Sequence, residues 1–459
     1  MGTFVRLYLL IPFVLFCQII YPQQLNNNKI TELINTYEKG TSFSGVVLLT
    51  QNDSLIYRKA FGYSNKTFDV ENTISTRFNL ASISKEIVVA AVIKLASEGK
   101  INLSSPVSKY VGNELGELGI TITVSQLLCH TSGLPREVEF NHCDNLTLKD
   151  FMERIKTLKL LFNSGEKYGY SNAGYIVLGR IIEVVTGVEY SKYIKNEILE
   201  PLKMDNTGFT NGEKVIKNLS TGYYLGRNGI SIGERSRQLG IYPPGGMYST
   251  ADDLVKFVQG LRYNKLFSSA WRDSIFNSHI GIEKNQYSGY GFEILLNGDK
   301  SYYLAAGSAE GNKNALLIDA KNRDIIIILS NDGDTPVFDI LKDLLKVKSG
   351  ETPVGPKVCN INDTTYYKKF VGEYDFSNSP LAAKMDQKNF IISFFFENGH
   401  FFLFDPSDNS TNQLCENEQR KLKLSFTNEM SIWFDTSKEN EYEMFISWDS
   451  TVSKGIRVK

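Results

Sequence analysis

The stretch Phe78–Lys100, FNLASISKEIVVAAVIKLASEGK, decides the fold of the larger part of the chain. Between residues 82 and 97 apolar residues recur at helical spacing, and Gly99 follows where a helix would end. The apolar residues that would share one face are Ile87, Val88, Ala91, Val92 and Leu95. The pattern predicts a strong helix over residues 82–97, with the tetrapeptide Ser82-Ile83-Ser84-Lys85 in its first turn.

That tetrapeptide holds the elements of nucleophilic chemistry. A serine hydroxyl is a poor nucleophile at neutral pH and needs a base. A lysine three residues later lies one helical turn along on the same face, so the amine of Lys85 can approach the oxygen of Ser82. Burial would lower the pKa of the lysine and leave it neutral, and the helix N-terminus would favour developing negative charge. The tetrapeptide alone is expected about once or twice by chance in a chain of this length, so it does not establish a site.

A second candidate segment is Tyr170-Ser171-Asn172, which precedes a helical pattern over Ala173–Thr186 that stops at Gly187. A tyrosine hydroxyl near an ammonium group can relay a proton, and an asparagine can orient both a lysine and an acyl group. The alternative is an ordinary loop in which Asn172 caps the helix and Tyr170 packs. The segment alone does not decide between the two.

A third candidate segment is Ala305–Gly311, AAGSAEG. A glycine in a strand allows close approach of a substrate, and the backbone N–H of Ser308 could donate to an oxyanion. By itself the segment is also a generic glycine-containing strand and turn.

The pattern around these segments predicts the architecture. Phe43–Leu49 and Ser54–Phe61 favour a β-hairpin, and Thr250 opens another predicted helix with an N-cap signature. The late runs predicted as consecutive antiparallel strands are Tyr302–Ala306, Asn314–Ile318 and Asp324–Ser330. Further short helices are expected over residues 29–37 and 124–129. Helices between an early hairpin and late strands predict an α/β (α+β) sandwich, an antiparallel sheet flanked by helices that joins both ends of the domain.

The chain divides into four predicted segments. Residues 1–23 are expected to be a signal peptide, 24–348 the main domain, 349–357 a linker rich in Pro and Gly, and 358–459 a small C-terminal all-β, barrel-like domain. The short β-type runs behind the last prediction are Phe390–Phe396, His400–Phe404, Lys421–Phe426, Met430–Phe434 and Tyr442–Ile446.

The leader carries Arg6 and then an apolar run, Leu7–Ile20, that is short for a bilayer span and suits a signal-peptide core. We expect a secreted or periplasmic protein, with an uncleaved membrane anchor as the minority alternative. Cleavage of the leader would leave four cysteines, Cys129, Cys143, Cys359 and Cys415. In an exported protein these cysteines can form disulfides. Of the three possible pairings, the local one joins Cys129 with Cys143 and Cys359 with Cys415, and free thiols are the open alternative.

Composition excludes several classes of function. Lys+Arg is 50 and Asp+Glu is 51, a formal net charge of −1, which argues against a nucleic-acid partner bound through phosphates. With only four histidines, and with no cysteine spacing typical of metal ligands, neither a metal site nor another cofactor is expected.

Five phrases in order give the chain its resemblance: FNLASISKEI, LLCHTSGLP, YGYSNAGYIVLG, PLKMDNTGF and PPGGMYSTADDLVKF. Together they resemble the serine β-lactamase and penicillin-binding-protein superfamily, in its branch of class C β-lactamases, D-Ala-D-Ala carboxypeptidases and esterases. The resemblance covers roughly residues 43–330, and KKFVGEYDF (368–376) more loosely resembles a C-terminal β domain often appended to that branch.

The resemblance implies a role for each candidate. Ser82 would be the acylated nucleophile, Lys85 its base partner and Tyr170 the proton shuttle or second base. Asn172 would contact Lys85 and the substrate. Gly307 would let the substrate approach, and the backbone N–H groups of Ser82 and Ser308 would form the oxyanion hole. His130 would be a hydrogen-bonded scaffold residue, and a Ser-His-Asp relay is not implied.

One departure from the family pattern concerns the substrate. The third motif usually begins with Lys or His two residues before the glycine, and this chain has Ala305 there. That basic side chain helps bind a substrate carboxylate, and Lys313 or Lys300 are nearby candidates to replace it. The expected function is therefore a serine hydrolase that forms an acyl-serine on a small-molecule or peptide-like ester or amide. The alternative is a weakened or inactive member that binds a peptidoglycan-like or peptide ligand.

Overall fold

The computed structural model describes most of the chain from Asn27 onward. The described residues are 27–41, 43–139, 146–210, 215–226, 229–232, 242–309, 311–356, 364–384, 389–397, 400–405, 410–416, 422–424, 430–435, 443–448 and 451–458. The predicted signal peptide lies outside them. No helix within these ranges is both long enough and apolar enough to span a bilayer.

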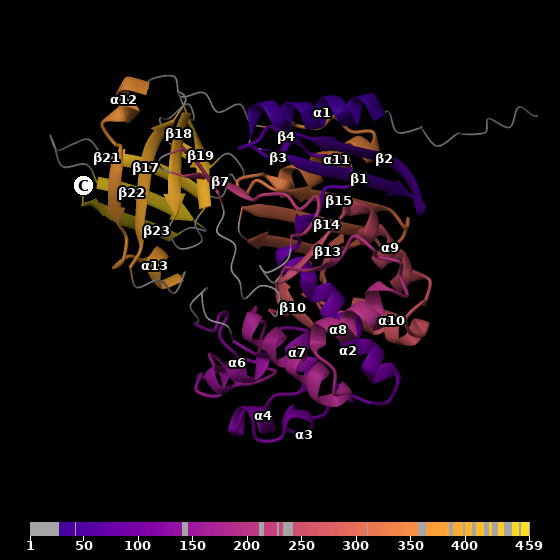
Figure 1. Cartoon of the computed structure of the whole chain (residues 1–459). Helices are drawn as coiled ribbons and strands as arrows, with labels where there is room; N and C mark the ends of the chain where they lie inside the picture. Colours follow the sequence, from indigo (N-terminus) through magenta and orange to yellow (C-terminus); the bar gives the residue numbers. More distant parts are fainter. Residues whose placement is uncertain are drawn as a thin grey trace, which may run out of the picture.

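An eight-stranded antiparallel sheet forms the centre of the larger part of the molecule, in the order β10-β11-β12-β13-β14-β15-β1-β2 (Figure 1). Its strands are β1 (Gly45–Gln51), β2 (Ser54–Phe61), β10 (Ile280–Glu283), β11 (Gln286–Ser288), β12 (Glu293–Asn297), β13 (Lys300–Ala309), β14 (Asn312–Asp319) and β15 (Ile325–Ser330). The early hairpin and the three late strands are confirmed. Because β1 pairs with β15, for example Val47 with Ile328, the sheet joins both ends of the domain as predicted.

The hairpin forms through its two-residue turn. Asn52 and Asp53 have φ angles of 48° and 66°. Asparagine and aspartate tolerate this left-handed region, and a turn with two such residues matches the twist of the strands that it joins.

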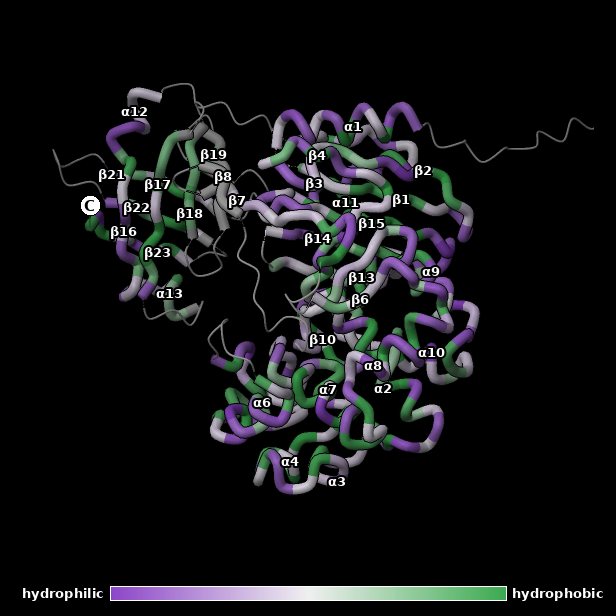
Figure 2. Tube along the Cα trace, viewed as in Figure 1, coloured by the Kyte–Doolittle hydropathy of each residue, from purple (hydrophilic) through white to green (hydrophobic). Residues whose placement is uncertain are grey.

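Helices cover both faces of the sheet (Figure 1). On one face α1 (Asn27–Gly40) and α11 (Val337–Ser349) pack on a cluster that includes Val47, Ile326 and Ile328. Figure 2 shows α1 with alternating hydrophilic and hydrophobic segments, as expected for a helix with one face to the solvent. On the other face lies a larger hydrophobic cluster, to which helices such as α2, α7 and α9 contribute buried side chains.

The remaining elements of this part are short strands and helices. The strands are β3 (Tyr63–Asn65), β4 (Val70–Glu71), β5 (Phe78–Asn79), β6 (Gly208–Phe209), β7 (Tyr223–Gly226), β8 (Gly229–Ile232) and β9 (Met247–Ser249). The helices are η1 (Ala81–Ile83), α2 (Ser84–Ser97), α3 (Ser108–Val111), α4 (Glu117–Thr121), α5 (Val124–Leu128), α6 (Leu148–Ile155), α7 (Asn172–Thr186), α8 (Tyr190–Ile194), η2 (Lys195–Leu199), α9 (Ala251–Arg262) and α10 (Ser269–Phe276).

Helix α2 differs from the prediction in how it is buried. The sequence pattern indicated one apolar face, but every residue from Ser84 to Ile93 is buried. The helix runs through the core and has helices and sheet around it, so apolar residues are needed on all its sides. Its first turn is also different, because Ser82 lies in the 3₁₀ turn η1 and the α-helix proper begins at Ser84.

The C-terminal part is a closed barrel of eight strands, which confirms the barrel-like β domain. Its elements are α12 (Thr364–Lys368), β16 (Gly372–Asp375), α13 (Pro380–Lys384), β17 (Ile391–Glu397), β18 (His400–Asp405), β19 (Ser410–Glu416), β20 (Leu422–Leu424), β21 (Met430–Asp435), β22 (Glu443–Trp448) and β23 (Thr451–Arg457). The sequence patterns missed β16, β19 and β23, which are less uniformly apolar. Phe394 and Phe401 fill the barrel core.

The disulfide between Cys129 and Cys143 is not formed, because Cys129 is a buried free thiol. Its sulfur donates to the carbonyl of Ser125 at 3.1 Å and lies 3.4 Å from the hydroxyl of Thr131. Cys143 and Cys359 lie outside the described residues.

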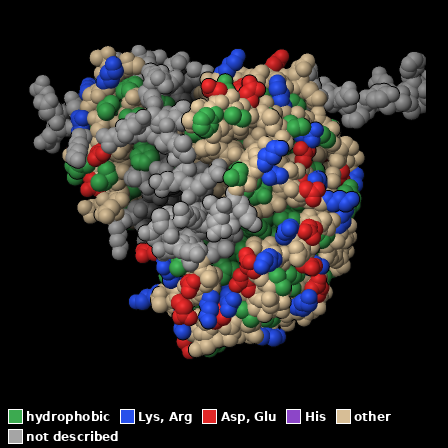
Figure 3. Space-filling model, in the orientation of Figure 1, with side chains coloured by type: hydrophobic (Ala, Val, Ile, Leu, Met, Phe, Trp, Pro, Cys, Tyr) green, Lys and Arg blue, Asp and Glu red, His purple; other side chains and the backbone are tan. Residues whose placement is uncertain are grey.

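Charged side chains of both signs are mixed over the face of the larger part that Figure 3 shows. Ion pairs in this part include Arg58–Asp252 and Arg180–Glu114.

Candidate active site

The turn that carries Ser82 is held in an unusual conformation. Strand β5 leads directly into η1, and Ala81 has a φ of 48°, in the left-handed region that non-glycine residues rarely adopt. The side-chain oxygen of Asn79 accepts a hydrogen bond from the backbone N–H of Ala81 at 2.9 Å. This bond stabilises the turn, which presents Ser82 at the start of α2.

The structure brings three predicted residues together. Lys85 Nζ donates to Ser82 Oγ at 3.0 Å, and Tyr170 Oη donates to the same oxygen at 2.8 Å. Lys85 Nζ also donates to the carbonyl of Pro244 at 2.9 Å and lies 4.8 Å from the centre of the Tyr170 ring. The serine oxygen is thus within proton-transfer distance of both a lysine and a tyrosine.

Burial sets the protonation of this trio. It lowers the pKa of Lys85 to about 7, with opposing contributions from Glu86 and Glu137. The Glu86 carboxyl is itself buried, which raises its pKa well above the ordinary value. Burial also raises the pKa of Tyr170 to about 12. Near neutral pH a large fraction of Lys85 is therefore the free amine, while Tyr170 keeps its proton.

His130 is a scaffold residue in this structure. Its Nδ1 accepts from the backbone N–H of Ser171 at 3.1 Å, and its ring stacks on Tyr170 with centroids 4.4 Å apart. Burial lowers the pKa of His130 to about 3, so the ring stays neutral. The imidazole fixes the position and tilt of the tyrosine.

Two expectations for Asn172 need correction. The cap of α7 is Ser171, whose hydroxyl accepts from the N–H of Gly174, and not Asn172. The contact with Lys85 is not formed, because Asn172 Nδ2 donates to Glu137 at 2.6 Å instead. The other amide atom of Asn172, Oδ1, is buried and has no hydrogen-bond partner among the described residues.

Gly307 lies against the turn that carries Ser82. A Cβ atom at Gly307 would be 2.2 Å from the carbonyl oxygen of Leu80 and 3.0 Å from the backbone nitrogen of Ser82. Only glycine fits so close to that backbone. Ser308 follows at the exposed end of β13, next to the same turn.

A buried asparagine that the sequence analysis missed connects this turn to the sheet. Asn314 pairs with Gly307 across β13 and β14. Its Nδ2 donates to the carbonyl of Asn79 at 2.9 Å, and its Oδ1 accepts from the N–H of Ser330 at 3.2 Å. The available signal was a polar residue directly before the apolar run Ala315–Ile318 of β14.

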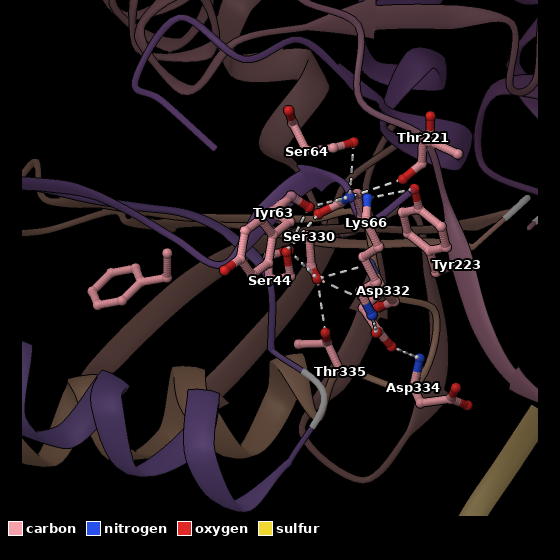
Figure 4. A network of polar contacts seen from close by, with 12 residues as sticks. Ser44, Tyr63, Ser64, Lys66, Thr221, Tyr223, Ser330, Asp332, Asp334 and Thr335 are labelled. Atoms are coloured by element: carbon pink, nitrogen blue, oxygen red, sulfur yellow. Dashed lines mark hydrogen bonds and ion pairs between the residues drawn. The ribbon is translucent and has the colours of Figure 1, made fainter. Parts of the chain in front are cut away.

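A polar network continues from Ser330 at the same end of the sheet (Figure 4). The Ser330 hydroxyl donates to the carbonyl of Ser44 at 2.9 Å and accepts from the N–H of Asp332 at 3.1 Å. Asp332 pairs with Lys66 at 2.9 Å, and the Lys66 ammonium lies 5.0 Å from the centre of the Tyr223 ring.

This network also fixes β7 beside the end of β13. The N–H of Tyr223 lies within hydrogen-bond distance of the carbonyls of Gly311 and Asn331, at 3.2 and 3.0 Å. Strand β13, which carries Gly307 and Ser308, pairs with β14, and the turn between these two strands is also held by β7.

The position that lacks a base is buried. Ala305 is 3% exposed and packs in the cluster that contains α2. Lys300 is exposed at the opposite end of β13, five residues away at roughly 3.3 Å per residue, too far to replace a side chain there. Lys313 pairs with Ser308, a register in which its side chain leaves the sheet on the opposite face from Gly307 and Asn314.

Metal ligands are not grouped in the described part of the chain. No set of three or more His, Cys, Asp or Glu side chains there could hold an ion.

Residues 30–349 match the family model described as Beta-lactamase. Protein flp of Staphylococcus aureus (strain MRSA252) is 29% identical over 302 residues, which are 64% of this chain and 60% of that protein. The chain thus spans about three fifths of the length of that relative. The putative penicillin-binding protein PbpX of Bacillus subtilis (strain 168) is 29% identical over 72% of this chain and 74% of its own length.

Among solved structures, the octameric penicillin-binding protein homologue from Pyrococcus abyssi is similar over 94% of this chain and 99% of its own. The TM-score is 0.66 at 24% identity, a likeness of fold. The family model covers well over half of the chain, and the turn with Ser82, Lys85 and Tyr170 lies within the matched residues. The chain therefore belongs to the beta-lactamase family, the penicillin-binding-protein-like superfamily of serine hydrolases.

Proposed function

We propose that the chain hydrolyses a small ester, amide or peptide-like acyl substrate through an acyl-enzyme on Ser82. The observation that carries the proposal is the pair of contacts at Ser82 Oγ, 3.0 Å to Lys85 Nζ and 2.8 Å to Tyr170 Oη. A base and an acid at the same oxygen are what an acyl transfer to serine requires.

In the acylation step, Ser82 Oγ attacks the carbonyl carbon and gives its proton to the neutral amine of Lys85. The carbonyl oxygen becomes an oxyanion, which the backbone N–H groups of Ser82 and Ser308 stabilise. When the bond to the leaving group breaks, Tyr170 donates its proton to that group and is reprotonated from Lys85. The result is an ester of Ser82, a neutral leaving group and a neutral lysine.

Deacylation repeats these steps with water. Water gives a proton to Lys85 and attacks the ester carbon, and the bond to Ser82 Oγ breaks as the Lys85 ammonium returns that proton to the serine oxygen. The pKa of Lys85 near 7 supports its role as the base, and the pKa of Tyr170 near 12 supports its role as the acid.

A second candidate function is binding without turnover, and Ala305 is the observation that favours it. The family's basic side chain is missing at that position, where the side chain is buried and apolar. A cleft that holds a peptidoglycan-like or peptide ligand would keep Ser82 without needing efficient proton transfer.

Export is part of the proposal, since Leu7–Ile20 has the length and apolar character of a signal-peptide core. N-terminal sequencing of the protein from culture medium or periplasm should begin close to residue 24. A chain that retains Met1 in the membrane fraction would contradict cleavage.

Replacing the nucleophile separates hydrolysis from binding. Ser82→Ala should lower kcat/KM for p-nitrophenyl butyrate by about a thousandfold or more, because the acyl-enzyme cannot form. The absorbance of the released p-nitrophenol at about 400 nm measures the rate. If wild type and Ser82→Ala are equally slow, the chain is not a serine hydrolase for such esters, and the binding function gains support.

The rate should depend on pH through Lys85. The protonated ammonium cannot accept a proton, so kcat/KM should increase as the pH rises through about 7, by about tenfold between pH 6 and pH 8. Tyr170 keeps its proton over this range because its pKa is about 12. Hydrolysis by Ser82→Ala provides the background to subtract. A flat or falling profile would exclude Lys85 as the base.

The buried asparagine should be needed to position the nucleophile. Asn314→Ala leaves the Asn79 carbonyl and the Ser330 N–H unsatisfied, which should lower the free energy of unfolding by about 2 kcal/mol or more. Because the Ser82 turn then loses its tie to β14, kcat should fall about tenfold or more, with a smaller change in KM.

Asn322→Ala is the matched control, because Asn322 is exposed in the turn after β14. Chemical denaturation and p-nitrophenyl butyrate kinetics measure both variants. Equal kcat values for Asn314→Ala and Asn322→Ala would show that Asn314 does not position the nucleophile.

A further inference from the structure

A second ionisable side chain is buried directly beside the proposed base. Glu86 follows Lys85 in the first turn of α2 and is 5% exposed. Glutamates are almost never fully buried in proteins unless they are paired. The mechanism proposed above gives Glu86 no part, so its burial next to Lys85 needs an explanation.

The Glu86 carboxyl packs against backbone and apolar atoms. A Cβ atom at Gly291 would lie 2.1 Å from Glu86 Oε2 and 3.1 Å from a methyl group of Val89. The N–H of Gly291 donates to the carbonyl of Leu128 at 3.2 Å, so this backbone is tied to the end of α5. Oε2 is buried and has no hydrogen-bond partner within the described ranges. A carboxylate in this place gains no hydrogen bond at Oε2, so a positive charge nearby is needed to stabilise it.

Lys85 provides that positive charge. Burial raises the pKa of Glu86 well above its ordinary value, whereas attraction to Lys85 lowers it and Glu293 on β12 raises it. Burial lowers the pKa of Lys85 to about 7, and the largest opposing effect is its attraction to Glu86. Each group therefore favours the charged form of the other, and the two titrate as a coupled pair.

The other ionisable groups around this pair come from the helical part and from the sheet. They are His130, Arg136, Glu137, Tyr168, Tyr170, Tyr175 and Glu293. Burial raises the pKa of each of the three tyrosines and lowers that of His130 to about 3, so these four are neutral near pH 7.

Two charged groups on the loop before α7 oppose each other. Arg136 lowers the pKa of Lys85 and Glu137 raises it. Their side chains are 72% and 54% exposed, so water and salt screen both charges. Glu86 is screened much less because it is buried, and it therefore has the stronger influence on the amine.

We propose that Glu86 is a positioning residue of the same reaction, which provides the negative charge beside Lys85 when the amine takes the proton of Ser82. The inference rests on the proposed function, because it names what controls the base of that site. An ammonium ion forms at Lys85 in a place away from water, and an adjacent carboxylate offsets the cost of that buried charge.

Glu86→Gln keeps the size of the side chain and removes its charge. The pKa of Lys85 should then fall, so the rise of kcat/KM with pH should move about one pH unit lower. The measured quantity is the ratio of kcat/KM at pH 6 to kcat/KM at pH 8, with p-nitrophenyl butyrate and the Ser82→Ala background subtracted. This ratio should increase about fivefold, because more of Lys85 is the free amine at the lower pH. At the higher pH kcat should fall about threefold or more, since a weaker base accepts the serine proton less readily.

Glu98→Gln is the matched control. Glu98 lies just beyond the other end of α2, roughly 18 Å from Glu86 at about 1.5 Å per residue, and pairs with Lys94 and Lys100. This variant should keep the wild-type ratio. Glu86→Met, which is of similar length and uncharged, should raise the ratio as Glu86→Gln does and keeps the test possible if Gln does not fold. A ratio in the Glu86 variants within about twofold of wild type, or an equal rise in Glu98→Gln, would overturn the proposal.

Labelling of Lys85 separates failure of this inference from failure of the proposed function. In Ser82→Ala, which cannot form an acyl-enzyme, the rate at which acetic anhydride acetylates Lys85 is followed by mass spectrometry over a range of pH. The midpoint of this curve reports the pKa of the amine without any hydrolysis. Adding Glu86→Gln should lower the midpoint by about one pH unit, and adding Glu98→Gln should leave it in place.

The two experiments together give distinct outcomes. If the midpoint moves but wild type hydrolyses no ester faster than Ser82→Ala, the hydrolase function fails and the role of Glu86 stands. If Glu86→Gln leaves the midpoint unchanged, Glu86 does not act on Lys85, whatever the rate of hydrolysis.

Discussion

The interaction on which the rest of the structure depends is the contact between the buried amine of Lys85 and the hydroxyl of Ser82. A lysine that is 2% exposed is costly as an ammonium ion, and this cost lowers its pKa towards 7. Its two hydrogen bonds, to Ser82 and Pro244, match the two N–H donors of the neutral amine. The burial of Lys85 goes with the position of α2, which is buried on all sides from Ser84 to Ile93 and so keeps the amine away from water.

The sheet fixes the nucleophile from the other side. Gly307 fits against the backbone of Ser82 because it has no side chain, and Asn314 ties the preceding Asn79 to β14. Ala81, whose backbone has a left-handed conformation, lies between these restraints. Strain of this kind persists only when the surroundings fix it, and here the helical part and the sheet both do so. The reacting oxygen is thus held by two layers that are far apart in the sequence.

The sequence predicted those parts that follow from local patterns and motif phrases. The antiparallel sheet, the barrel-like C-terminal part and the trio of Ser82, Lys85 and Tyr170 were found in this way. The all-round burial of α2 could not be predicted, because a helical period shows one face but not what surrounds the others. The missed strands β16, β19 and β23 are less uniformly apolar than their neighbours. Asn314 belongs to none of the motif phrases, and only folding brings its side chain to the carbonyl of Asn79 in front of the Ser82 turn.

Acyl transfer to Ser82 is the central claim of this account, and trapping of the nucleophile tests it most directly. The protein is treated with a fluorophosphonate, digested and mapped by mass spectrometry. The account predicts one adduct, on the peptide that contains Ser82, which is lost when the lysine beside it is replaced in Lys85→Ala. An adduct on another residue, or equal labelling of wild type and Ser82→Ala, would contradict it.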